Sequence, residues 1–573
     1  MAGMRVVLAF LCALPLLAQI PGAEAFQRAL ADREAITAYL EEEARTITDA
    51  AAREIAATGD WEKVRAARRE ELRDSLGLLP WPEKTPLQLK ITGTVDQPAY
   101  RIEKVTFQSL PGFHVTANLY LPKRSGRLPT VIYVCGHAGT DAGSKATYQR
   151  HGISLAKNGY VAMVIDAIQH SEVYAIHRGV YLYSKYDWYA RGYTPAGVEV
   201  WNAIRALDYL ETRPEVDQER IGMTGRSGGA AMSWFTAAVD ERIKAVVPVM
   251  GISTYAANVR HNTQKGHCDC MFPVNFCRHD MIHQGALIAP RPLLMAHGVE
   301  DSLFPVPGYK EFEQRVGGLY SAYKRGAHFH NIEVAGGHSD SDYLREQAIR
   351  WFDRHLLGLD QPRELDLSYE NLPDSELSVF GGNPPDDVLN PVVQDLFTAR
   401  APEALPSTRE AWESRRTSLM KTLREKVFRS FPAVPATMLV DRKPAGRTEV
   451  LRVTTEQGIH IDGRLWKPER AIGPVPAVLY IASEGETVLE TDRLLRGVRA
   501  LGEAATLVIY PRGVSDVPWD EQFRKDTMRN AMHVGHTIDS MRLYDVLRAF
   551  EFLSTEPGIN PERIMVMGRG AHA

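Results

Sequence analysis

The sequence predicts an α/β protein whose core is a mostly parallel sheet with helices on both faces. Three observations support this: short apolar runs alternate with helical stretches, the runs are apolar throughout, and a β-hairpin precedes them. Strands that are apolar on both sides belong in a sheet that helices cover on each face. The runs are residues 130–134, 161–165, 221–224, 245–250, 292–296 and 331–334.

The other elements fit the same plan in chain order. A helical segment, rich in Ala, Glu, Arg and Leu, covers residues 26–80. Residues 105–122 are expected to form two strands around a Pro-Gly turn. Helices are expected at residues 197–212, 230–239, 308–316 and 342–357. A hairpin followed by βα repeats is the order that an α/β-hydrolase fold requires.

Length and charge narrow the function. The chain of 573 residues is too long for one compact core, so more than one domain is expected. The formal net charge of -4 gives no reason to expect a nucleic-acid partner.

A signal peptide is predicted over residues 1–25. It consists of Arg5, an apolar run over residues 6–17 and Ala23-Glu24-Ala25. This run is shorter than the roughly 20 residues that span a bilayer, so we expect a secreted or periplasmic protein without a membrane anchor.

The second half of the sequence echoes the first. Residues 105–122 resemble 453–468, residues 128–134 resemble 475–481, and residues 219–228 resemble 562–571. We therefore predict a tandem duplication, with a catalytic domain at 81–380, a linker at 381–406 and a second hydrolase-like domain at 407–573. Gly570 occupies the position that matches Ser227, so this second domain is expected to be non-catalytic. Because the strands that would carry an acid and a histidine are missing, it is also expected to be truncated.

A nucleophile elbow is predicted at Gly225-Arg226-Ser227-Gly228-Gly229. This Gly-x-Ser-x-Gly pattern lies between a predicted strand and a predicted helix, where a sharp turn projects the serine hydroxyl. The alternative is a structural serine in a glycine turn, but the flanking strand and helix favour the nucleophile.

Asp301 and His338 are the predicted partners of Ser227. Serine needs an imidazole to take its proton, and the imidazole needs a carboxylate to orient it. Asp301 follows the strand at 292–296, and His338 follows the strand at 331–334 after two glycines. The alternative readings are a helix-capping Asp301 and an ordinary loop histidine. The competing acids are Glu300, Asp340 and Asp342, and the competing bases are His297, His328 and His330.

The oxyanion hole is predicted from two backbone amides. Gly228 would supply one from the helix after the nucleophile, and the loop Cys135-Gly-His-Ala-Gly139 would supply the other. The sequence leaves the second donor open between His137 and Ala138.

A cysteine-rich loop at residues 266–279 has several possible chemistries. His267, Cys268, Cys270, Cys277 and His279 could all bind zinc, but their spacing fits no common zinc motif. A disulfide or buried thiols are therefore preferred, with neither metal nor cofactor expected. An aromatic insertion nearby is expected mainly to pack a lid, with one or two side chains touching substrate: Tyr174, Tyr181, Tyr183, Tyr186, Trp188, Tyr189 and Tyr193.

Five segments across residues 70–360 together resemble the bacterial acetyl xylan esterase and dienelactone-hydrolase-like carboxylesterases. They are residues 135–137, 148–161, 225–229, 266–271 and 289–294. The resemblance implies an esterase acting on acylated carbohydrate, small or polymeric. Residues 166–172 depart from the Gly-rich turn of those relatives, which leaves the acyl pocket undefined.

Two other functions stay open. A serine peptidase of the prolyl-oligopeptidase type has the same order of nucleophile, acid and histidine, but it carries a β-propeller, and no blade-like repeat precedes residue 81. A non-catalytic binding module would need both repeats to be inactive, which the intact Ser227, Asp301 and His338 set disfavours. The oligomeric state is not predicted.

Overall fold

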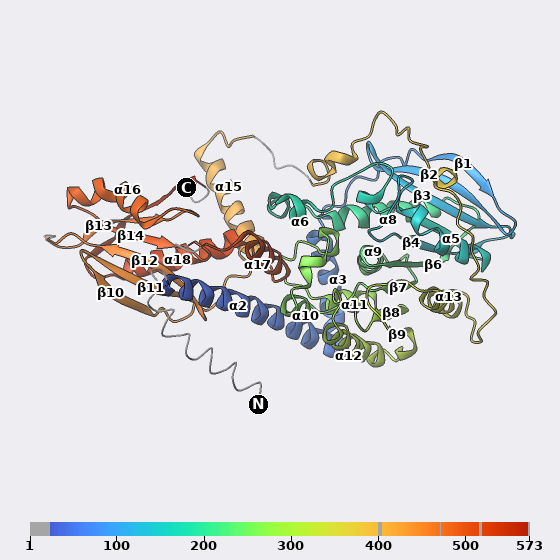
Figure 1. Cartoon of the computed structure of the whole chain (residues 1–573), viewed down its shortest axis with the longest axis horizontal. Helices are drawn as coiled ribbons and strands as arrows, with labels where there is room; N and C mark the ends of the chain where they lie inside the picture. Colours follow the sequence, from blue (N-terminus) through green and yellow to red (C-terminus); the bar gives the residue numbers. More distant parts are fainter. Residues whose placement is uncertain (1–22, 399–403, 470–471, 515–517, 571–573) are drawn as a thin grey trace. The chain divides into compact units, whose positions relative to one another are not determined.

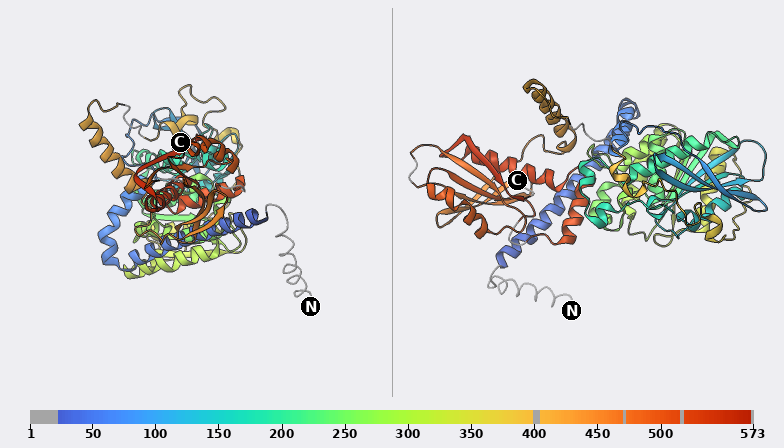
Figure 2. Two further views of the ribbon diagram at one scale, coloured as in Figure 1. Left: turned by 90° about the vertical axis from the view of Figure 1, so that its left-hand side faces the viewer. Right: turned by 90° about the horizontal axis from the view of Figure 1, so that it is seen from above.

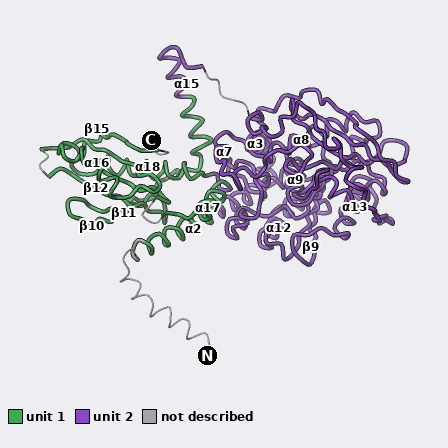
Figure 3. The backbone as a smooth tube through the Cα atoms, turned by 45° about the horizontal axis from the view of Figure 1, so that its top comes forward, with its two compact units in different colours: residues 1–43, 418–532, 536–573 green, residues 44–417, 533–535 purple. Residues whose placement is uncertain are grey.

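The computed structural model describes residues 23–398, 404–469, 472–514 and 518–570 (Figure 1). The chain forms two compact units, which Figure 3 colours separately. The larger unit comprises residues 44–417 and 533–535, and the smaller unit comprises residues 1–43, 418–532 and 536–573. Residues 1–22 of the predicted signal peptide lie outside the described part. No described helix is long and apolar enough to cross a membrane.

The larger unit is built on a nine-stranded sheet of order β1-β2-β3-β5-β4-β6-β7-β8-β9. Its first strands are antiparallel, and from β5 and β4 onward the pairs are parallel. The strands are β1 (Lys90–Asp96), β2 (Tyr100–Leu110), β3 (Phe113–Pro122), β4 (Leu128–Val134), β5 (Val161–Ile165), β6 (Val216–Arg226), β7 (Ala245–Val249), β8 (Leu293–Gly298) and β9 (Phe329–Val334). Every residue of β3, β5 and β7 is buried, as expected for strands covered on both faces.

Helices cover both faces of this sheet. On β6, Gly225 faces α9 (Gly228–Val239), whereas Gly222 faces Phe352 of α13 (Asp342–Leu356). Because strand residues an odd number apart point to opposite faces, these two helices lie on opposite sides of the sheet. The predicted sheet with helices on both faces is therefore present. Further helices of this unit include α3 (Thr58–Ser75), α5 (Gln149–Lys157), α8 (Pro195–Leu210), α11 (Met281–Ile288) and α12 (Val306–Ala322).

The smaller unit has a six-stranded sheet of order β10-β11-β12-β14-β13-β15. Its strands are β10 (Val440–Ala445), β11 (Thr448–Glu456), β12 (Ile459–Trp466), β13 (Val475–Ile481), β14 (Ala505–Tyr510) and β15 (Ile559–Gly568), and its helices include α16 (Val488–Leu501), α17 (Glu521–His533) and α18 (Ile538–Thr555). This order repeats that of the first six strands of the larger unit. Gly570 has φ +61°, close to the φ of 58° at Ser227. The tandem duplication stays a prediction that these similarities favour.

Helix α2 (Ala23–Ala56) is one continuous helix, drawn in blue in Figure 2, and its residues divide between the two units at residues 43 and 44. Its first part belongs to the smaller unit, where Tyr39 donates a hydrogen bond to Glu456 (2.8 Å). Its last part belongs to the larger unit, where Thr48 donates to Asp280 (2.7 Å). Residues before 44 and most residues after 417 therefore belong to the smaller unit, and the segment between them forms the larger unit.

Candidate active site

Ser227 occupies a strained turn at the carboxyl end of β6. The strand ends at Arg226, and α9 begins at Gly228. Ser227 has φ 58° and ψ -119°, a backbone conformation that non-glycine residues rarely adopt. Its N–H donates to the carbonyl of Val249 on the neighbouring strand (3.0 Å), which holds the turn in place. This strand, strained serine and helix form the nucleophile-elbow geometry.

Two glycines of this turn are required by close approach. A Cβ at Gly229 would lie 2.0 Å from the carbonyl oxygen of Val134 on β4. A Cβ at Gly228 would lie 2.5 Å from two ring atoms of His137. The first glycine lets α9 pack onto the sheet, and the second lets the His137 imidazole lie against the residue that follows Ser227.

Asp301 and His338 are in direct contact. They lie on the loops after β8 and β9, which are adjacent parallel strands. The two loops are tied together by a hydrogen bond from the Glu300 N–H to the Gly336 carbonyl (3.0 Å). Asp301 Oδ2 lies 2.7 Å from His338 Nδ1, and the Leu303 N–H donates to Asp301 Oδ1 (2.9 Å).

The electrostatics of this pair favour an ionised carboxylate. Burial of Asp301 raises its pKa, but the hydrogen bond and charge of His338 and the Leu303 amide outweigh it, so the pKa lies below its usual value. A carboxylate facing Nδ1 requires that this nitrogen carry the proton. The arrangement leaves His338 Nε2 as the proton acceptor of the imidazole.

Ser227 and His338 lie at the same edge of the sheet but are not hydrogen bonded to each other in the described part of the chain. The His137 ring packs on Gly228 and interacts electrostatically with His338. Catalytic hydrogen bonds are often loose in ligand-free enzymes and tighten with substrate. The structure therefore joins the predicted acid to the predicted histidine, and Ser227 occupies the turn after β6 at the same edge of the sheet.

Of the two candidate amides in the predicted oxyanion loop, one is already used. The Ala138 N–H already donates to the Gly136 carbonyl (3.0 Å), closing a tight turn. In the described residues, neither the His137 N–H nor the Gly228 N–H donates to another backbone carbonyl outside regular structure. Of the two donors that the sequence left open, the geometry favours His137.

The competing acids and bases have other roles or positions. Asp340 is within 2.8 Å of both Arg150 and His151, and His297 lies 3.0 Å from Asn331 and 3.2 Å from the Ile252 carbonyl. His328 lies 2.9 Å from the Pro290 carbonyl. The remaining candidates are Glu300 and Asp342, both exposed, and His330, on β9.

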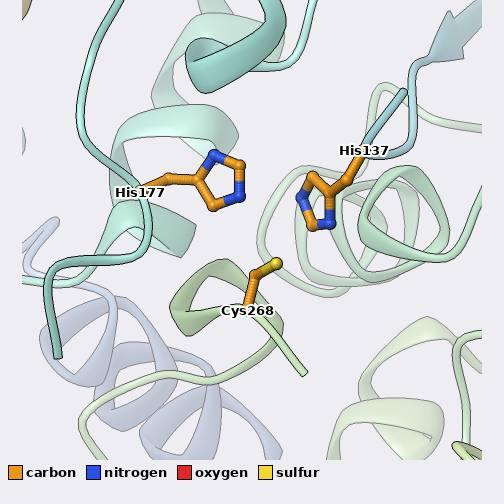
Figure 4. A group of neighbouring side chains, drawn as sticks. All are labelled: His137, His177 and Cys268. Atoms are coloured by element: carbon orange, nitrogen blue, oxygen red, sulfur yellow. The ribbon is translucent and has the colours of Figure 1, made fainter. Parts of the chain in front are cut away.

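A cluster of imidazoles and thiols adjoins the elbow. The side chains of His137, His177 and Cys268 converge, with their donor atoms all within 4.8 Å of one another (Figure 4). Cys270 Sγ lies 3.1 Å from His137 Nε2. Burial lowers the pKa of His137 to about 3 and holds that of His177 well below its usual value. Both rings are therefore neutral near pH 7.

The aromatic insertion divides into packing and surface residues. Trp188 and Tyr193 are buried against each other, whereas Tyr174 and Tyr183 are exposed. Tyr181, Tyr186 and Tyr189 are half-buried. The same insertion carries His177, a residue that sequence reasoning missed because its aromatic neighbours dominated the pattern.

The described cysteines of the larger unit are all buried: Cys135, Cys268, Cys270 and Cys277. Whether two cysteines of the 266–279 loop form a disulfide or stay buried thiols remains a prediction.

Ring contacts link this loop to the predicted histidine. Phe304 stacks on His338 with ring centroids 5.9 Å apart, and His267 stacks on Phe304 at 5.0 Å. These contacts bring the cysteine-rich loop to the same region as the acid and histidine.

Comparison with known proteins finds a family match within the larger unit. Residues 87–263 match the acetyl xylan esterase (AXE1) family. The matched region includes Ser227 and the oxyanion loop, and it ends before Asp301 and His338. Residues 87–263 of the larger unit are therefore similar to the acetyl xylan esterase family.

Individual proteins also match parts of the chain. The YtaP protein of Bacillus subtilis (strain 168) is 27% identical over 314 residues, which cover 51% of this chain and 100% of that protein. The protein PA2218 of Pseudomonas aeruginosa is 29% identical over 170 residues, covering 28% of this chain and 42% of that protein. Among solved structures, "Methylesterase BT1017" superimposes with a TM-score of 0.51 at 20% identity, covering 66% of this chain and 81% of that chain. Together with the sheet described above, this likeness confirms the predicted α/β-hydrolase fold.

Proposed function

We propose that the protein is a serine carboxylesterase that hydrolyses acyl esters of carbohydrates. The observation that carries the proposal is the 2.7 Å contact between Asp301 and His338 at the sheet edge where Ser227 occupies its strained turn. The acetyl xylan esterase-like domain supports a carbohydrate ester as the substrate class.

In the proposed reaction, the Ser227 hydroxyl oxygen attacks the ester carbonyl while His338 Nε2 takes the hydroxyl proton. His338 returns this proton to the departing alcohol, and water then hydrolyses the acyl-enzyme by the same route. Asp301 holds the imidazole with Nδ1 protonated. The amides of Gly228 and His137 stabilise the oxyanion, aided by the N-terminus of α9. We also propose that the chain is exported by the predicted signal peptide.

Ser227→Ala tests the nucleophile. We expect turnover of p-nitrophenyl acetate to fall by about 10³-fold or more, because only the oxyanion hole and substrate binding remain. Ser321→Ala, which changes an exposed serine on α12, is the matched control and should keep full activity. Wild-type activity in Ser227→Ala would refute the proposal.

Probe labelling and a substrate panel separate the alternatives. A fluorophosphonate should label the wild type at Ser227 and leave Ser227→Ala unlabelled, whereas a binding module would stay unlabelled in both forms. Comparing acetylated xylan, methyl and glucuronoyl esters, and proline peptides then identifies the substrate. Preference for the peptides would replace the esterase with the peptidase.

A further inference from the structure

His177 is buried in an unusual way. Its side chain is 0% exposed, and neither ring nitrogen has a hydrogen-bond partner in the described part of the chain. Buried polar groups are ordinarily paired, so an imidazole of this kind needs an explanation. Its ring points toward His137 and Cys268 (Figure 4), and its centroid lies 4.4 Å from that of His137.

The three residues come from separate parts of the larger unit. His137 follows β4, His177 lies in the aromatic insertion before α6 (Gly179–Tyr183), and Cys268 precedes a short 3-10 turn (Asp269–Met271). Their donor atoms nevertheless lie within 4.8 Å of one another. Donors from distant segments that converge on one point are the arrangement of a metal site rather than of one local turn.

The donors select a class of metal. Two imidazole nitrogens and one thiolate suit a borderline-soft divalent ion, and Zn²⁺ takes such ligands at about 2.0–2.3 Å in tetrahedral geometry. Donors around such an ion lie roughly 3.3–3.6 Å apart, so a donor pair at the 4.8 Å limit has to close by roughly 1.2–1.5 Å when the ion binds. Three protein ligands leave the fourth position to water.

A neighbouring side chain holds the sulfur in place. The Arg178 Nε–H donates to Cys268 Sγ (3.1 Å) and would remain as an outer partner of the bound ion.

We propose that His137, His177 and Cys268 form a Zn²⁺-binding site beside the nucleophile elbow. On binding, the Cys268 thiol releases its proton to solvent, one Zn–S and two Zn–N bonds form, and no electron is transferred. The site does not depend on the proposed esterase function, because its ligands are side chains that the hydrolytic steps do not use. Packing of the His137 ring on Gly228 places the ion next to the predicted oxyanion amides.

Cobalt binding to the full chain tests the site. After treatment with a chelator, the wild type should take up one equivalent of Co²⁺, with the near-ultraviolet thiolate-to-cobalt charge-transfer band and the intense visible bands of tetrahedral coordination. Zn²⁺ should displace both signals. Cys268→Ser should abolish the charge-transfer band, and its affinity for Zn²⁺ should fall by at least the ~10–100-fold typical of losing even an outer partner.

Matched variants distinguish this thiol and this imidazole from their neighbours. Cys270→Ser and His170→Ala change a nearby thiol and a nearby imidazole, and both should keep the wild-type spectrum. His177→Ala should weaken binding as Cys268→Ser does. If His177→Ala fails to fold, the nearly isosteric Cys268→Ser decides. Absence of Co²⁺ uptake by the wild type, or a band lost in Cys270→Ser but kept in Cys268→Ser, would overturn the proposal whether or not the protein hydrolyses esters.

Discussion

Glu199 is a carboxylic acid enclosed in the larger unit. It is 5% exposed and accepts a hydrogen bond from the Ile168 N–H (3.2 Å). Burial raises its pKa to about 8, although the Ile168 amide lowers it slightly. The folded protein therefore keeps a proton on Glu199 at pH values where the unfolded chain has released it.

Glu199→Gln tests the effect of this proton on stability. In the wild type, the free energy of unfolding should fall as pH rises from about 4.5 to about 8, by at most about 1.4 kcal/mol per pH unit from this residue. The glutamine variant has no such titrating group. The difference between its free energy of unfolding and that of the wild type, measured by urea denaturation, should therefore increase in favour of the variant between pH 5 and pH 8. Glu370→Gln, at an exposed position, is the control. An equal difference at both pH values would contradict the prediction.

At the residue scale, the sequence predicted those side chains whose positions follow from strand ends. Asp301 and His338 each follow a buried strand, and adjacent strands bring them together. The choice between His137 and Ala138 was beyond the sequence, because it depends on which amide the turn at Gly136 uses. The convergence of His177 with Cys268 was equally hidden, since no local pattern links an insertion to a loop some ninety residues away.

The packing of α9 on β4 requires a residue without a side chain at Gly229. Because a Cβ at Gly229 would lie 2.0 Å from the Val134 carbonyl oxygen, which is backbone, the helix would have to move. We expect Gly229→Ala to lower the free energy of unfolding by about 1–3 kcal/mol or more. Activity should fall as well, since the movement displaces Ser227.

Gly318→Ala on α12 is the matched control for this substitution. A Cβ at Gly318 would meet no other described residue within 4 Å beyond its own helix and chain neighbours, and Gly318 is also helical. Alanine there should be neutral or stabilise the protein by about 0.5–1 kcal/mol, the usual preference of a helix interior. Thermal denaturation of both variants checks the pair, and similar melting temperatures would contradict the close-packing argument.

At the element scale, the elements predicted best were strands with continuous apolar sequence. Residues 161–165 form β5 with the predicted bounds, and residues 342–357 form α13 within one residue. The strand β1 was missed because Lys90–Asp96 is polar, contains Gly93 and lies mostly exposed at the sheet edge. An edge strand is defined by backbone pairing with β2, which leaves little trace in the side-chain pattern.

At the scale of the whole molecule, the smaller unit depends on the start of the chain. Tyr39 of α2 donates to Glu456, whose other oxygen accepts from the buried Arg512 (2.6 Å). Arg512 also pairs with Asp545 (2.6 Å), so a buried charge network joins α2 to residues more than 400 positions later.

Tyr39→Phe should weaken this network selectively. Removing a hydrogen bond to a buried charged group costs about 1–3 kcal/mol. We therefore expect faster amide hydrogen exchange in β11 and β12 and unchanged exchange in β5 and β6 of the larger unit. Tyr174→Phe, at an exposed position of the larger unit, is the control. Equal acceleration in all four strands would show that the network does not act locally.

The path of α2 also constrains the order in which the protein can mature on the ribosome. Residues 23–43 are made before the larger unit, yet the described residues that share their unit, within 418–532 and 536–570, are made after it. The apolar side chains of residues 23–43 therefore stay exposed to solvent until nearly four hundred further residues have been synthesised. If the gene were divided at the predicted linker, residues 23–43 would be encoded in one fragment and the rest of the smaller unit in the other. Neither fragment would then encode a complete smaller unit.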